Sequence, residues 1–153
     1  MIMQTTVNCC IKRVYVLSGA SNAGKTSTLN LLAKMLDNDK ARFSRIGTWK
    51  LKTGWHDGKY VFKEKSSGRR IGIVTAGDGV RQIIDGFTFL SKNRCEVCFV
   101  ASKTFGVSVE TIESQYVKTC KIIPRYCFLI NEYAARSPRT IWRDVARQLF
   151  SEI

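Results

Sequence analysis

One short segment carries residues whose types and spacing suit the binding of phosphate. It follows the apolar run 14–18 and reads Gly19-Ala20-Ser21-Asn22-Ala23-Gly24-Lys25-Thr26. Its two glycines let the chain curl tightly, because they carry no Cβ that would obstruct an approaching oxyanion. Backbone N–H groups from about residue 22 to residue 26 then point inward at the start of a predicted helix. The pattern G-x-x-x-x-G-K-[ST] therefore predicts a site for the polyphosphate of a nucleoside triphosphate.

The side chains at the end of this segment have separate expected roles. Lys25 supplies a mobile positive charge to the β- and γ-phosphate oxygens. Thr26 places a hydroxyl on Mg²⁺, and Ser27 donates a hydrogen bond to the α-phosphate. A chance match is the alternative, but apolar residues recur at helical spacing directly after the segment, over 29–36. We therefore expect ATP and Mg²⁺ as the cofactors.

Two further candidate residues follow predicted strands. Asp78 comes after the run 69–76 and could hold Mg²⁺ through water or accept a proton from an attacking hydroxyl. The alternative for Asp78 is a helix N-cap. Lys103 follows the predicted strand 96–101, where a cation can neutralise a transferring phosphoryl group; the alternative is a solvated loop lysine. We expect Lys25, Asp78 and Lys103 to be catalytic, and Thr26 and Asp78 to be the metal ligands.

Arginines gather near a predicted closing helix at 139–152. Arg136 and Arg139 lie beside Ser137-Pro138 and could fold over a nucleotide like a lid, whereas Arg143 and Arg147 could simply form a polar face. The expected nucleotide-binding residues are Gly19, Ser21, Asn22, Ala23, Gly24, Lys25, Thr26, Ser27, Arg136 and Arg139.

Strands alternate with helices along the sequence. The predicted strands are 12–18, 42–50, 59–65, 69–76, 96–101 and 121–130, and the predicted helices are 25–37, 79–92, 109–116 and 139–152. Short strand–helix–strand crossovers build a parallel sheet with helices on both faces. We expect an α/β fold with a mostly parallel sheet, an inserted β-hairpin at about 42–70, and a single domain over 1–153. Ligands of open sheets lie beyond the carboxyl ends of the strands, where the candidate residues fall.

The net charge of +13 is large for 153 residues and indicates an anionic partner. Residues 40–70 contain ten basic side chains and two acidic ones, with aromatic residues among them. Basic and aromatic side chains together can hold phosphates and stack bases, so this basic hairpin could bind nucleic acid. The alternative is a solvated hairpin whose aromatic residues cover the sheet.

Other features narrow the class of protein. No apolar run approaches the roughly 18 residues that span a membrane, and the first ten residues do not resemble a signal peptide. The six cysteines are expected to be reduced thiols, as is usual in a cytosolic protein. A zinc site is disfavoured because Cys95 and Cys98 fall in a predicted strand, where residues three positions apart point to opposite faces. We expect a cytoplasmic protein with no membrane partner.

With these residues in place, the chain resembles the P-loop kinases, the group that contains the adenylate and nucleoside kinases. The resemblance is carried by residues 19–26 and by the order of the elements, and it implies a three-layer P-loop fold. Asp85-Gly86-Phe87 looks like the start of the Asp-Gly-Phe-Pro-Arg motif of adenylate kinases but lies inside a predicted helix. The matching position is 101–104, where Lys103 stands in place of the arginine. No guanine-reading Asn-Lys-x-Asp sequence appears, which disfavours a GTPase switch.

Three functions fit this pattern. The first is a small kinase that moves the γ-phosphate of ATP to a hydroxyl or phosphate acceptor, held between the hairpin 42–70 and Asp78. The second is a nucleotide-dependent protein that binds nucleic acid or an acidic partner through the basic hairpin, with ATP as a ligand or slow switch. The third is a P-loop protein without turnover.

Overall fold

The computed structural model describes residues 10–19, 24–50, 57–103, 110–112, 125–128 and 138–153. Its elements are β1 (Arg13–Ser18), α1 (Lys25–Asn38), β2 (Phe43–Lys50), β3 (Gly58–Glu64), β4 (Arg70–Val74), α2 (Val80–Lys92), β5 (Val97–Ser102), β6 (Arg125–Phe128) and α5 (Pro138–Ser151). Each lies over a predicted element of the same type. None of the described helices is both long and apolar enough to cross a membrane.

The strands of the described residues form one six-stranded mixed sheet in the order β2-β3-β4-β5-β1-β6. The strands β4, β5, β1 and β6 are parallel to their neighbours within this group, whereas β3 runs antiparallel to both β2 and β4. The expectation of a P-loop fold with a mostly parallel sheet and an inserted hairpin is therefore wrong, because the sheet is mixed. Residues 42–70 do not stand apart as an insertion, because β2 and β3 continue the sheet and form one of its edges.

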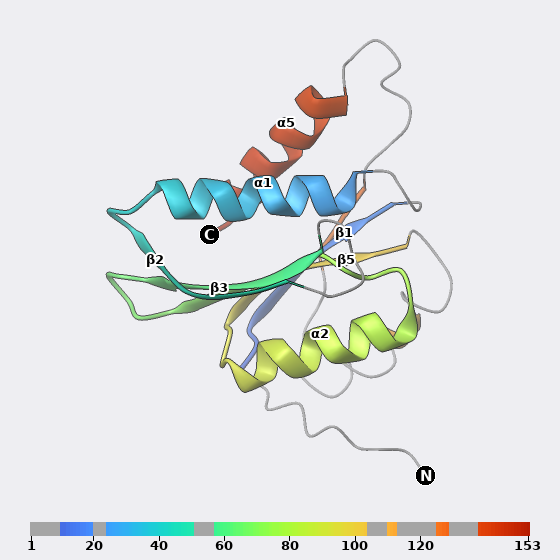
Figure 1. Cartoon of the computed structure of the whole chain (residues 1–153), viewed down its shortest axis with the longest axis horizontal. Helices are drawn as coiled ribbons and strands as arrows, with labels where there is room; N and C mark the ends of the chain where they lie inside the picture. The colour runs from blue at the N-terminus through green and yellow to red at the C-terminus, as the bar shows by residue number, and fades with distance from the viewer. Residues whose placement is uncertain (1–9, 20–23, 51–56, 104–109, 113–124, 129–137) are drawn as a thin grey trace.

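The sheet is buried on both faces because β1 alternates its side chains between two cores. Tyr15 and Leu17 face a core that α1 and α5 cover, while Val14 and Val16 face a core that α2 covers. Figure 1 shows α1 and α5 together on one side of the sheet and α2 on the other. This double burial explains why β1 reads as a continuous apolar run rather than an alternating one.

The helix α1 forms because its apolar residues recur at helical spacing. Leu29, Leu32, Ala33 and Leu36 are all buried and lie along one stripe of the helix. The helix ends at Asn38, and the backbone N–H of Asp39 closes its last turn by donating to the carbonyls of the preceding residues. The stripe fixes α1 against the sheet, and thereby fixes the position of its amino end.

The aromatic residues of the hairpin face inward in the part that is described. Phe43 and Phe62 are fully buried beneath α1 and α5. Tyr60 is half-buried, and its hydroxyl donates to Asn30 Oδ1 of α1 at 2.8 Å. Burial raises the pKa of the Tyr60 phenol above its usual value of 10.0, because it disfavours the charged form. These residues attach the hairpin to α1 and are not exposed for stacking on bases.

Candidate phosphate-binding site

The amino end of α1 presents backbone N–H groups that no side chain caps. Gly24 takes a left-handed conformation with φ 97°, and no acidic residue lies in the first turn. The first helical hydrogen bond runs from the N–H of Thr28 to the carbonyl of Gly24 at 2.9 Å. The N–H groups of the first turn and the helix dipole both favour an anion at this position.

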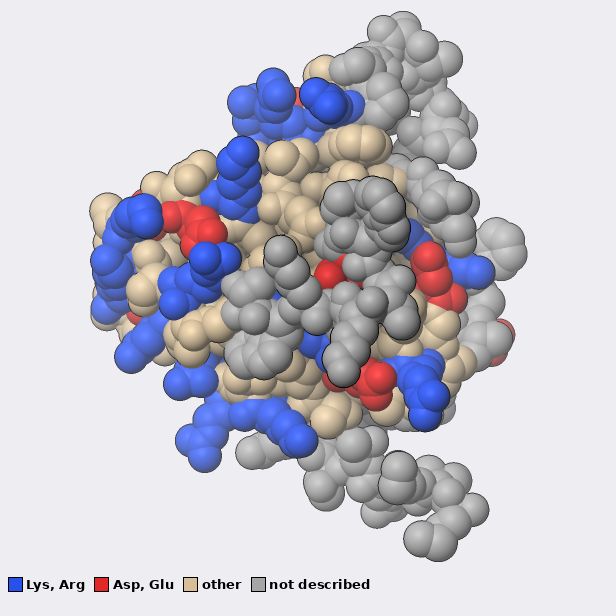
Figure 2. All heavy atoms as spheres, in the orientation of Figure 1, with Lys and Arg blue, Asp and Glu red and all other residues tan. Residues whose placement is uncertain are grey.

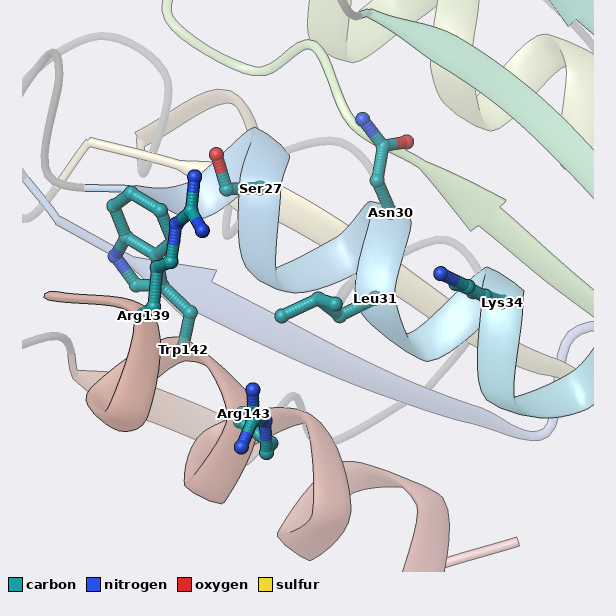
Figure 3. Close-up of a pocket in the computed structure, with 7 residues that line it drawn as sticks. All are labelled: Ser27, Asn30, Leu31, Lys34, Arg139, Trp142 and Arg143. Carbon is teal, nitrogen blue, oxygen red and sulfur yellow. The ribbon is translucent and has the colours of Figure 1, made fainter.

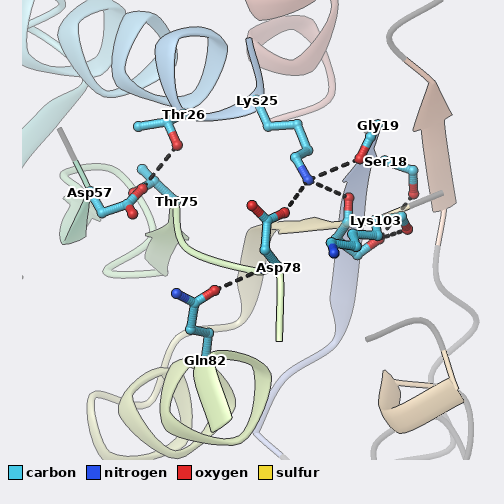
Figure 4. Close-up of polar contacts among 10 residues, drawn as sticks. Ser18, Gly19, Lys25, Thr26, Asp57, Thr75, Asp78, Gln82 and Lys103 are labelled. Atoms are coloured by element: carbon cyan, nitrogen blue, oxygen red, sulfur yellow. Dashed lines mark hydrogen bonds and ion pairs between the residues drawn. The ribbon is translucent and has the colours of Figure 1, made fainter. Parts of the chain in front are cut away.

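The Lys25 ammonium is buried at this end of α1 and has all three of its protons engaged. Its Nζ donates to Asp78 Oδ1 at 2.5 Å, to the Gly19 carbonyl at 2.9 Å and to the Ser102 carbonyl at 3.1 Å (Figure 4). The side chain of Lys25 is 6% exposed, whereas that of Asp78 is 47% exposed. Asp78 is thus the acceptor that an arriving anion can displace most easily, because the two carbonyls belong to strand ends.

Close backbone packing sets the position of Asp78 beside Lys25. The preceding residue, Gly77, runs so near β5 that an added Cβ would lie 1.7 Å from the carbonyl oxygen of Ala101. The N–H of Asp78 is held by Gln82 Oε1 at 2.8 Å, in the first turn of α2. The carboxylate is therefore directed at Lys25 and not used as the N-cap of α2, whose N-cap is Gly79.

A second carboxylate, Asp57, contacts the hydroxyl that was expected to bind Mg²⁺. Thr26 Oγ1 donates to Asp57 Oδ1 at 2.9 Å, and Thr75 Oγ1 donates to the same oxygen at 3.0 Å. The Thr75 hydroxyl in turn accepts the N–H of Gly58 at 2.8 Å. The carboxylate joined to Thr26 by a hydrogen bond is thus Asp57, whereas Asp78, the ligand expected from the sequence, bonds Lys25.

The sequence interpretation missed Asp57 because it treated the hairpin as an insertion. Asp57 immediately precedes β3, and β3 runs antiparallel to β4. The amino end of β3 therefore lies beside the carboxyl end of β4, on the side of the sheet where β5 and β1 also end. The signal in the sequence that could have identified Asp57 is the Asp57-Gly58 pair at the start of a strand that pairs antiparallel with β4.

The donor set suits a hard cation bound together with a polyphosphate. Thr26 and Asp57 offer oxygen ligands, which Mg²⁺ prefers. Within the described part of the chain, no three His, Cys, Asp or Glu side chains are grouped as a metal site. Mg²⁺ that arrives with a nucleotide needs only one or two protein oxygens, because phosphates and waters complete its shell. The residues present therefore fit such an ion.

The other predicted site residues divide into three groups. Lys103 follows β5 with its side chain exposed, next to Ser102, whose carbonyl accepts from Lys25. Arg139 lies in the first turn of α5 and lines the same pocket as Ser27. The remaining candidates lie outside the described residues, namely Ser21, Asn22, Ala23 and Arg136.

A pocket of about 460 Å³ opens between α1 and α5, beside the first turn of α1. From α1 it is lined by Ser27, Asn30, Leu31 and Lys34, and from α5 by Arg139, Trp142 and Arg143 (Figure 3). The indole of Trp142 lies directly against Gly24, since an added Cβ on Gly24 would be 1.9 Å from Trp142 Nε1. The helix α5 therefore contacts both the phosphate-binding segment and the pocket next to it.

Lys and Arg side chains are spread over the described surface. Figure 2 shows Lys and Arg side chains over the ends of β2 and β3 with acidic side chains among them, and again over α5. On the hairpin side, Arg42, Arg45 and Arg69 each pair with a carboxylate. These pairs partly neutralise the basic hairpin.

The geometry thus brings one lysine, two carboxylates and the amino end of a helix to a single edge of the sheet. No protein family, curated protein or solved structure matches the chain, and its function must be inferred from these residues.

Proposed function

We propose that the protein binds Mg²⁺-ATP at the amino end of α1 and transfers the γ-phosphate to a hydroxyl or phosphate acceptor. The observation that carries this proposal is the convergence of the buried Lys25 ammonium with the Thr26–Asp57 pair at an uncapped helix end. A buried cation beside free backbone N–H groups suits a polyphosphate. The proposal includes a cytoplasmic location, where cysteines stay reduced.

Binding exchanges one anion for another at Lys25. The Lys25 ammonium holds the carboxylate of Asp78, whose side chain is 47% exposed. A phosphate oxygen that takes this place keeps the ammonium neutralised and releases the carboxylate. Asp78 is then a base next to the transferring group, and Lys25 and Lys103 are the cations that oppose its charge.

In the proposed reaction, the acceptor oxygen forms a bond to the γ-phosphorus and the bond from that phosphorus to the β,γ-bridging oxygen breaks. ADP leaves, and the acceptor proton passes to the Asp78 carboxylate. Mg²⁺, when bound through Thr26 and Asp57, would supply positive charge to the phosphate oxygens. The chain itself contributes orientation, through fixed carbonyls and hydroxyls at the strand ends.

The test is transfer of label from γ-labelled ATP to a panel of nucleosides, nucleoside monophosphates, sugars and oligonucleotides. We expect Lys25→Met and Asp78→Asn to abolish transfer. A matched control is Asp85→Asn, because Asp85 is an exposed aspartate on α2 away from Lys25; it should transfer at the wild-type rate. Absence of any thermal shift at saturating Mg²⁺-ATP would refute nucleotide binding itself.

A second candidate function is an ATP-dependent protein that binds an anionic partner, such as nucleic acid, through the hairpin. The observation in its favour is exposed basic side chains on β3, on the turn before β2 and on the turn after β3, among them Lys40, Lys63 and Lys65. ATP hydrolysis that oligonucleotides stimulate, with no labelled acceptor, would favour this function. Oligonucleotide binding that weakens steeply with salt and is reduced in Lys40→Ala/Lys63→Ala would locate the partner there.

A further inference from the structure

Three cations line the pocket between α1 and α5, and the residues that the structure describes offer them no acidic partner. Lys34, Arg139 and Arg143 all line it, and none has a carboxylate within 4.0 Å among the described residues. One turn further along α5, outside the pocket, Arg147 does pair with Asp144, at 4.0 Å. Cations gathered in a hollow, with no counter-charge in the described part of the chain, suit a ligand that carries acceptor oxygens or nitrogens.

The same pocket also has flat and apolar walls. Figure 3 shows Trp142 and Arg139 on α5 near the amino end of α1, with Leu31 facing them from α1. Nucleobases stack both on aromatic rings such as indole and on guanidinium groups. The volume of about 460 Å³ lies within the range of small-molecule sites.

This pocket is continuous with the candidate phosphate site. Ser27, which follows Lys25 and Thr26 in the first turn of α1, lines the pocket, and Trp142 contacts Gly24. A ligand whose phosphates lie at Lys25 would therefore enter the pocket at the end nearest its α-phosphate.

We propose that the pocket between α1 and α5 holds the nucleoside of the nucleotide whose phosphates bind at Lys25. This inference rests on the proposed function. The base stacks on Trp142, and Arg139 and Arg143 donate to its sugar and ring acceptors, with Lys34 at the far end. The pocket thereby distinguishes a nucleoside triphosphate from a bare polyphosphate.

The test compares the dissociation constants of Mg²⁺-ATP and Mg²⁺-tripolyphosphate by calorimetry. Trp142→Ala should weaken ATP binding by about 5- to 150-fold, the range for loss of one stacked base, and change tripolyphosphate binding by less than about twofold. Arg143→Ala should weaken ATP binding by up to about fivefold, and Trp142→Phe should retain most of the affinity. Arg147→Ala is the matched control and should bind both ligands as the wild type does.

The ratio of the two constants separates the pocket from the phosphate site, because a disturbed α1 terminus weakens both ligands alike. Trp142→Phe and Arg143→Ala keep the test decisive where Trp142→Ala does not fold. Equal affinity for ATP and tripolyphosphate in the wild type, or an ATP preference that persists in Trp142→Ala, overturns the pocket assignment and leaves the proposed function standing. Binding of neither ligand overturns both.

Discussion

Replacing Gly24 with alanine tests whether α5 really packs on the phosphate-binding segment. Two separate penalties apply at this position. The left-handed φ of 97° costs a residue with a Cβ about 1–2 kcal/mol. The new methyl would also lie 1.9 Å from Trp142 Nε1, and overpacking of this kind costs about 1–3 kcal/mol. We therefore expect Gly24→Ala to lower the free energy of unfolding by about 2–5 kcal/mol.

Two other glycines provide matched controls for the two penalties. Gly68 has φ 74°, but its added Cβ meets nothing closer than Lys63 Cε at 3.8 Å, so Gly68→Ala should cost only the backbone term, about 1–2 kcal/mol. Gly79 has extended φ and open space around it. The free energy of unfolding of Gly79→Ala should therefore stay within about 1 kcal/mol of the wild-type value. Alanine is a poorer N-cap than glycine, but it also lowers the conformational entropy of the unfolded chain, and the two effects oppose each other.

The assay is urea unfolding of the three variants, with Trp142→Ala and Gly24→Ala/Trp142→Ala completing a double-mutant cycle. Removal of the indole should relieve the steric cost of Gly24→Ala and leave its backbone cost unchanged. The coupling energy between positions 24 and 142 should therefore be about 1–3 kcal/mol. A Gly24→Ala cost equal to that of Gly68→Ala, with no coupling to Trp142, would refute the contact between α5 and the segment.

Three further predictions concern the polar groups. Asp78→Asn should tighten ATP binding about two- to fivefold in calorimetry, because it weakens the competitor for Lys25; weaker binding would mean that Asp78 contacts the nucleotide directly. Asp57→Asn should raise the Mg²⁺ concentration needed for ATP binding by about ten- to a hundredfold in a Mg²⁺ titration, and an unchanged Mg²⁺ dependence would argue against a metal role. The hydrogen bond from the Ser67 hydroxyl holds the pKa of Glu64 below its usual 4.5. Glu64 therefore contributes stability above about pH 4.5, and this contribution is lost as the pH falls through the lowered pKa. In urea unfolding, Glu64→Gln should make the free energy of unfolding depend less steeply on pH below about pH 4.5. A pH dependence as steep as that of the wild type would contradict this.

The sequence predicts the elements and the place of Lys25 at the amino end of α1 well, because both depend on local patterns. The apolar residues of α1 recur at helical spacing, and β1 is a short apolar run of the kind that forms a strand buried on both faces. A Gly-Lys-Thr sequence before that stripe places Lys25 at the helix end without knowledge of the rest of the fold. Strand direction is different, since it depends on which strands pair, and pairing joins residues far apart in the sequence.

That dependence explains the two errors at the site. The run 59–65 reads equally well as a hairpin strand outside the sheet or as a strand within it. Only the pairing of β3 with β4 places Asp57 beside Thr26. In the same way, the position of Asp78 against Lys25 follows from the passage of Gly77 across the backbone of β5, a close approach that no local pattern predicts.

The contact between Trp142 and Gly24 also bears on when the site becomes competent during synthesis. The two residues lie more than a hundred positions apart in the sequence. During translation, α1 and the described strands leave the ribosome before α5 does. At that stage the chain lacks the Trp142 indole that packs against Gly24, and it also lacks the arginines of α5. Contacts between such distant segments form late, since a long loop must close first. A nascent chain should therefore reach its full nucleotide affinity only after α5 emerges, and a chain cut short before Trp142 should bind nucleotide more weakly although it carries the G-x-x-x-x-G-K-[ST] sequence.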